Sequence, residues 1–160
     1  MKLYSLTVVL ASIVLTPSVA QEYKIITTVE SIVPMGIGRS RIVDSQTSAD
    51  YKALTTERTD GKKSSQGDIK REDIKIDNFE ETKLLNFYSA VGINFQNVAS
   101  NDAVVSSKLN ELVNAGWALA FVTSGVESDA GEKDANGIFI TRYIFKRDKP
   151  TPSVTSTSGQ

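Results

Sequence analysis

The chain has 160 residues and a formal net charge of −1, from 18 basic and 19 acidic side chains. It contains no histidine and no cysteine, which excludes disulfide bonds, thiolate metal sites, a lipid anchor on cysteine and the Ser-His-Asp triad. A charge this close to zero gives no electrostatic reason to expect nucleic-acid binding.

The first 20 residues have the pattern of a secretory signal peptide. Lys2 supplies a positive start, residues 6–15 are apolar, and residues 18–20 are small enough for a cleavage site. A membrane anchor is the alternative, but the apolar run is shorter than the about 20 residues that a spanning helix needs. We expect an exported protein, periplasmic or extracellular, whose mature chain begins at Gln21 and does not span a membrane.

The N-terminal half of the mature chain predicts two strands and a long excursion. Residues 22–32 alternate in polarity, which is typical of a half-buried strand, and a Pro-Gly-rich turn separates them from a second strand at 39–44. Residues 47–82 are mostly polar and form the excursion. We expect residues 83–89 to be a strand that pairs with 40–46; a helix there is the alternative.

Residues 102–116 have the apolar spacing of an amphipathic helix. Its apolar face is expected to consist of Val105, Leu109, Leu112 and Val113. The N-cap is expected at Ser100, Asn101 or Asp102. Gly116 predicts a left-handed C-terminal turn, after which Trp117 packs back on Leu112.

Two strands are predicted after the helix, at 117–123 and 138–147. The last strand carries Ile138, Ile140, Arg142 and Ile144 on one face. It carries Phe139, Thr141, Tyr143 and Phe145 on the other. Because both faces are substantially apolar, the second face is expected to meet either the inserted segment or a second subunit. A homodimer through Phe139, Tyr143 and Phe145 is the form that we expect such an interface to take.

These elements predict an α+β fold: a small antiparallel sheet of about four strands with one main helix packed on it. The domain is expected to span residues 21–148. The Pro-, Ser- and Thr-rich tail from residue 149 is expected to be disordered.

Several of these segments resemble a small bacterial family of domains of unknown function. The likeness lies in the strand Tyr23–Ile26, in the run Lys108–Leu112 leading into Ala115-Gly116-Trp117, and in the closing Tyr143–Arg147. Segments 29–34, 38–41 and 91–95 are similar to a longer exported version in Bacteroidota-type bacteria. The chain departs from that pattern at Ala118, where members usually carry an acid, and in its longer excursion. The resemblance implies a compact α+β fold and no particular activity.

The segment Gly36-Ile37-Gly38-Arg39-Ser40-Arg41 is a candidate anion site. Two guanidinium groups beside glycine-rich backbone suit a phosphate, sulfate or carboxylate group. The segment lacks the lysine of a P-loop and the third glycine of a dinucleotide motif. The alternative is a turn whose arginines pair with surface acids.

Other chemical patterns are weaker. Residues 132–137 resemble the start of a calcium loop, but Tyr143 occupies the position of the bidentate Glu, so a turn is the better interpretation. Glu80 and Glu81, with Asp77 nearby, suit a glycosidase only if two acids face each other across a cleft. Ser124 and Ser128 have no visible base. We therefore expect no catalytic residue, no metal and no cofactor.

The sequence favours an exported, non-enzymatic module that binds an envelope protein, a glycan or a second copy of itself. One alternative is a carboxylate-dependent hydrolase acting on cell-wall or extracellular glycans. Another is a structural subunit of an envelope assembly.

Overall fold

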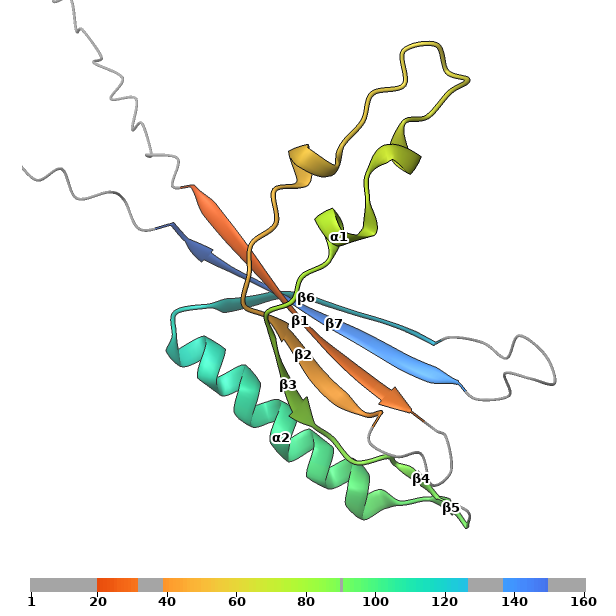
Figure 1. The fold of residues 1–160 in the computed structure, drawn as a ribbon. Coiled ribbons are helices and arrows are strands. Elements are labelled where there is room, and N and C mark those ends of the chain that lie inside the picture. Colours follow the sequence, from red (N-terminus) through yellow and green to blue (C-terminus); the bar gives the residue numbers. More distant parts are fainter. Residues whose placement is uncertain (1–19, 32–38, 90, 127–136, 150–160) are drawn as a thin grey trace, which may run out of the picture.

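The computed structural model describes residues 20–31, 39–89, 91–126 and 137–149. It is an α+β fold in which one face of an antiparallel sheet is covered by a long helix (Figure 1). The strands of this sheet are β1 (Gln21–Ser31), β2 (Arg41–Ser45), β3 (Phe79–Lys83), β6 (Ala118–Val126) and β7 (Ile138–Asp148). Their order is β3-β2-β1-β7-β6, so the sheet has five strands rather than about four.

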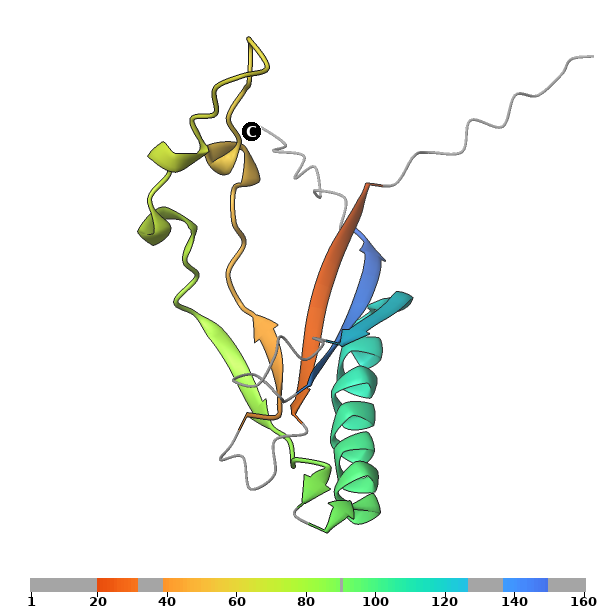
Figure 2. The same ribbon diagram turned by 90° about the vertical axis from the view of Figure 1, so that its right-hand side faces the viewer.

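The helix α2 spans Phe95–Asn114 and follows a short hairpin made of β4 (Tyr88–Ser89) and β5 (Gly92–Ile93). The view in Figure 2 shows the sheet and α2 as two layers. The predicted signal peptide up to residue 19 and the predicted tail after Lys149 lie outside the described residues.

The long pair β1 and β7 forms the centre of the sheet. All 11 residues of β1 pair with β7, from Gln21 opposite Asp148 to Ser31 opposite Ile138. The Lys149 amide extends this ladder by donating to the Ala20 carbonyl oxygen at 2.7 Å. Both strands were predicted to within about two residues at their ends, because alternation and β-branched composition are local signals.

The prediction that residues 83–89 form the strand that pairs with 40–46 is wrong. The partner of β2 is Phe79–Lys83, with Asp44 opposite Glu80 and Arg41 opposite Lys83. Every residue of β3 is exposed and three of its five are charged, so it lacks the apolar alternation that identifies a strand. The ladder ends where the Leu84 amide donates to the Ser40 carbonyl oxygen at 3.0 Å.

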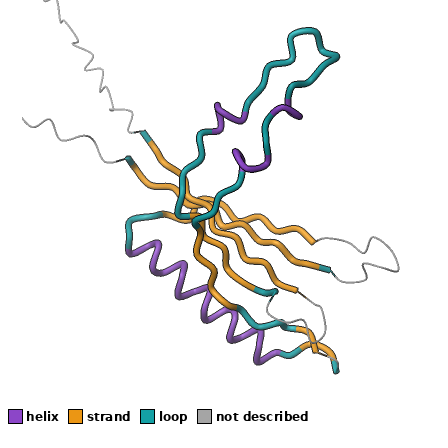
Figure 3. The backbone as a smooth tube through the Cα atoms, in the orientation of Figure 1, coloured by secondary structure: helices purple, strands orange, loops and turns teal. Residues whose placement is uncertain are grey.

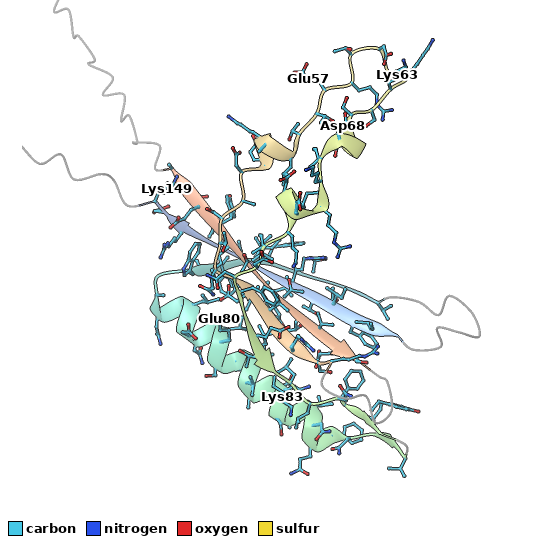
Figure 4. All side chains as sticks on the ribbon, viewed as in Figure 1. Glu57, Lys63, Asp68, Glu80, Lys83 and Lys149 are labelled. Atoms are coloured by element: carbon cyan, nitrogen blue, oxygen red, sulfur yellow. The ribbon has the colours of Figure 1, made fainter. Side chains whose placement is uncertain are left out.

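The excursion between β2 and β3 forms an arm that extends away from the sheet (Figures 1 and 3). It contains only short helical turns: η1 (Tyr51–Leu54), η2 (Gln66–Asp68) and α1 (Arg71–Ile74). Figure 4 shows the charged side chains Glu57, Lys63 and Asp68 on its outer part. None of the three turns buries a residue, so the arm adds nothing to the core.

The helix begins earlier than the sequence predicted and ends where it predicted. Asn94 is the N-cap, and its side chain accepts a hydrogen bond from the Asn97 amide at 3.2 Å. At the other end Gly116 has φ +85°. The Trp117 amide donates to the Leu112 carbonyl oxygen at 3.0 Å and the Gly116 amide to that of Val113 at 2.9 Å, which is a Schellman motif.

The core lies between α2 and the face of the sheet that α2 covers. Its buried side chains are Ile26, Ile42, Leu84, Leu112 and Phe145. Trp117 packs against this cluster, as predicted, together with Val104, Val105, Leu109 and Tyr143. Neighbouring strand residues point to opposite faces. In the part of the chain that the structure describes, no helix covers the other face of the sheet, which we call the open face.

Candidate interaction surface

Apolar side chains line up across three strands of the open face. Ile25 of β1 lies opposite Ile144 of β7, which in turn lies opposite Phe121 of β6. We call these three residues the apolar row. Ile25 is 50% exposed and Phe121 61% exposed. Side chains this exposed are available to a partner, and cross-strand neighbours are close enough to act as one surface.

The next rows of the open face differ in polarity. Thr27, Arg142 and Thr123 form a polar row beside the apolar row. Val29, Ile140 and Gly125 form the row after that, which is apolar again. The open face therefore has apolar rows separated by a polar one.

The strand β6 is exposed along its whole length. All nine of its residues are exposed, including side chains on both faces such as Leu119 and Phe121. Among the described residues it forms one edge of the sheet and pairs with β7 alone. Every second residue of an edge strand directs its N–H and C=O away from the sheet. The β6 edge thus offers unpaired backbone groups next to exposed apolar side chains.

The predicted dimer residues lie on the face that α2 covers. Phe145 has no exposed surface, and Tyr143 packs against the core cluster. Phe139 is 40% exposed and makes an edge-to-face contact with Phe87, at a centroid distance of 5.7 Å. The prediction of two alternating faces on β7 is correct. The aromatic face was expected to meet the inserted segment or a second subunit, whereas in the structure α2 packs on Tyr143 and Phe145.

The structure describes three residues of the predicted anion site, Arg39, Ser40 and Arg41. Ser40 is buried; its hydroxyl oxygen accepts from the Ser31 amide at 3.1 Å and donates to Asn86 Oδ1 at 2.7 Å. Arg41 forms an ion pair with Glu81 across β2 and β3. Arg39 is exposed, and Gly36 and Gly38 lie outside the described residues. Arg41 therefore has the acidic partner that the alternative expected, while the expected turn lies outside the described residues.

The two acids considered for a glycosidase, Glu80 and Glu81, do not face each other across a cleft. Glu80 and Glu81 are neighbours on β3 and so point to opposite faces of the sheet. Glu80 lies 3.7 Å from the Lys108 ammonium, while Glu81 pairs with Arg41. Within the described ranges no group of three or more His, Cys, Asp or Glu side chains is arranged to hold a metal. Of the calcium-like segment only Gly137 is described.

One buried carboxylate joins the helix to the sheet. Asp44 is 2% exposed, and its oxygens lie 2.6 Å from Lys24 Nζ and 3.2 Å from Lys108 Nζ. Partial burial opposes the charged form of Lys108. Hydrogen bonds and charge attraction from Asp44 and Glu111 outweigh it, so the pKa of Lys108 is raised. A carboxylate held by two ammonium groups connects β1, β2 and α2 rather than facing a ligand.

No family model, curated protein or solved structure matches the chain. The interpretation of the surface therefore rests on its own geometry. Among the described helices, none combines the length and the apolar character that crossing a membrane requires.

Sequence reasoning missed Phe121 and Ile25 as surface residues, although it placed both in strands. Their meeting depends on the register of β1 with β7 and of β7 with β6. The local signal that was present is the absence of charge in residues 118–126, in contrast to the charged segment 79–83.

Proposed function

We propose that this chain is an exported, non-enzymatic interaction module of the bacterial envelope that binds another protein chain through the β6 edge. The observation that carries the proposal is that β6 is exposed along nine residues and carries no charge. Added strands bind an open edge by main-chain hydrogen bonds, and alternate side chains give specificity. Export is supported by the signal-like pattern of residues 1–20.

The other edge strand of the sheet, β3, provides an internal comparison for β6. Phe79 is 45% exposed on β3, in a strand that also carries Glu80, Glu81 and Lys83. Figure 4 labels Glu80 and Lys83 along this edge. Charged side chains on an edge strand oppose pairing with a further strand. The proposal therefore places binding at β6 and not at β3.

The test uses a photo-crosslinking amino acid at Phe121 or, as the matched aromatic control, at Phe79, in cells that make the full chain. We expect covalent adducts after irradiation from position 121 and few from position 79. Equal adducts from both positions, or none from position 121, would overturn the proposal.

The alternative of a structural envelope subunit uses the same edge. It predicts that a partner copurifies with the chain in fixed stoichiometry. The glycan hydrolase gains no support from the described acids, because Glu80 and Glu81 lie on opposite faces.

A further inference from the structure

We propose that the strand added to β6 is β6 of a second copy of this chain, in antiparallel orientation, with Thr123 on the two-fold axis. This inference rests on the proposed function and names its partner. It differs from the dimer expected through Phe139, Tyr143 and Phe145, since it uses the edge of the sheet and not a face.

The composition of β6 suits pairing with itself. The strand reads Ala-Leu-Ala-Phe-Val-Thr-Ser-Gly-Val, with no charge and no proline. A two-fold axis brings identical segments together, so any charge would meet its own copy. An uncharged edge has no such repulsion, and the absence of proline leaves every amide able to donate.

The faces of the strand limit the register. The ladder with β7 is irregular between Leu119 and Phe121 and regular from Phe121 to Val126. In an antiparallel pair, residues directly opposite each other share a face. A two-fold axis through Thr123 opposes residues that share a face, and it keeps these pairs within the regular part of β6. It sets Phe121 opposite Gly125 of the second copy, and Val122 opposite Ser124.

The space above Gly125 favours this register. A Cβ built on Gly125 would have no heavy atom within 4 Å. An aromatic ring opposite a glycine in a neighbouring strand covers the bare backbone of the glycine. Two copies related by the axis place two such Phe–Gly pairs on the open face.

The register also joins the apolar rows of the two copies. Ile25, Ile144 and Phe121 of one copy continue into Gly125, Ile140 and Val29 of the other, because each set is already aligned across its own sheet. At the axis, the polar row that contains Arg142 and Thr123 meets the same row of the second copy. The two Arg142 side chains are then three strand spacings apart, about 14 Å, which exceeds the screening length of about 8 Å at physiological salt.

Pairing of this kind stops at two copies. After the β6 edges have paired, the free edges of the ten-stranded sheet are the two β3 strands, which carry Glu80, Glu81 and Lys83. Charged edges oppose further strand addition. A strand of nine residues is about 30 Å long, so this contact lies at the small end of protein interfaces.

Cysteine crosslinking tests the axis directly, because the chain has no cysteine of its own. Cα atoms of directly opposed residues in an antiparallel pair are about 4.5–5.5 Å apart, within the disulfide range. Under mild oxidation Thr123→Cys is expected to give a covalent dimer on the order of tenfold faster or more than Thr82→Cys, since pairing raises the local thiol concentration. Thr82 is the matched control, an exposed threonine on the β3 edge.

Light scattering on the purified chain supplies the second test. We expect a dimer that Phe121→Lys converts to a monomer. Because Phe121 is not part of the core, the melting temperature of the variant should equal that of the wild-type chain at a concentration low enough to dissociate the dimer. The matched Phe79→Lys variant is expected to remain dimeric. A wild-type monomer at high concentration, or equal disulfide rates at positions 123 and 82, would overturn the self-pairing. A Phe121 photo-adduct containing a different protein would overturn it as well and leave the proposed function standing.

Discussion

The side-chain amide of Asn101 bonds both backbone groups of Leu85. Asn101 Nδ2 donates to the Leu85 carbonyl oxygen at 2.7 Å, and the Leu85 amide donates to Asn101 Oδ1 at 2.8 Å. Strand β3 ends at Lys83, so Leu85 has no backbone partner in the β2–β3 ladder. The Asn101 side chain takes the place of that partner where the chain continues toward the β4–β5 hairpin. Asn101 is 3% exposed and also contacts Glu30 Oε1 at 3.2 Å.

We expect Asn101→Ala to lower the free energy of unfolding by about 2–4 kcal/mol, because the backbone groups of Leu85 lose their partner in a partly buried site. Asn97→Ala is the control: its side-chain amide makes one bond, to the Asn86 carbonyl oxygen at 2.7 Å. The control should cost about 1 kcal/mol. Urea unfolding measures both, and equal losses would contradict the role assigned to Asn101.

The turn after α2 gives a second prediction. Gly116 has φ +85°, with no heavy atom within 4 Å of an added Cβ, so a substitution is opposed by backbone strain alone. Gly116→Ala is expected to cost about 1 kcal/mol in a thermal or urea melt. Gly67→Ala, at an equally open position without positive φ, is expected to be neutral. A neutral Gly116→Ala variant would show that the turn can rearrange.

The C-terminal block was predictable because its signals are local. The spacing of Leu109 and Leu112 and the glycine at 116 give a helix and its end. The helix start at Asn94 was missed, because the first turn carries an exposed Phe95 and no apolar periodicity. The strand β3 was missed for a similar reason, since an exposed, charged edge has no core-facing residues.

Local sequence patterns could not predict which face of the sheet α2 covers. Ile144 and Phe145 are equally apolar neighbours on β7, and alternation places them on opposite faces without saying which face meets the helix. The choice depends on partners far away in the sequence: Ile26, Ile42 and Leu84 lie on the side of Phe145 and complete the core there. The open face, and with it the apolar row, follows from that choice.

The Asp44 carboxylate gives a third prediction. Asp44→Asn is expected to lower the free energy of unfolding by about 2–4 kcal/mol, because the Lys24 and Lys108 ammonium groups lose their shared buried counter-charge. The matched surface variant is Asp77→Asn, whose pair with Lys75 is exposed on both sides. That variant should change stability by less than about 1 kcal/mol. Similar effects of the two substitutions in urea unfolding would show that the buried cluster is not a tether.

The same cluster predicts a loss of stability at alkaline pH. The pKa of Lys108 is raised above its ordinary 10.5 in the folded chain, where Asp44 and Glu111 favour the ammonium form despite partial burial. The unfolded chain therefore loses this proton first. The contribution of Lys108 is fully present below pH 10.5 and is lost as the pH rises through the folded pKa.

Unfolding free energies measured by urea at several pH values from about 9 to about 11.5 check this prediction. Burial also raises the pKa of Tyr143. The hydrogen bond to Thr28 lowers this pKa by less, and the negative charges of Glu30 and Asp102 raise it further. The Tyr143 phenol adds to the fall in stability in the same window, so the comparison is made in a Tyr143→Phe background. In that background Lys108→Met should flatten the fall, whereas Lys70→Met, which removes a solvent-exposed pair with Glu72, should leave it unchanged. An equally steep fall with and without Lys108 would show that its proton is not linked to folding.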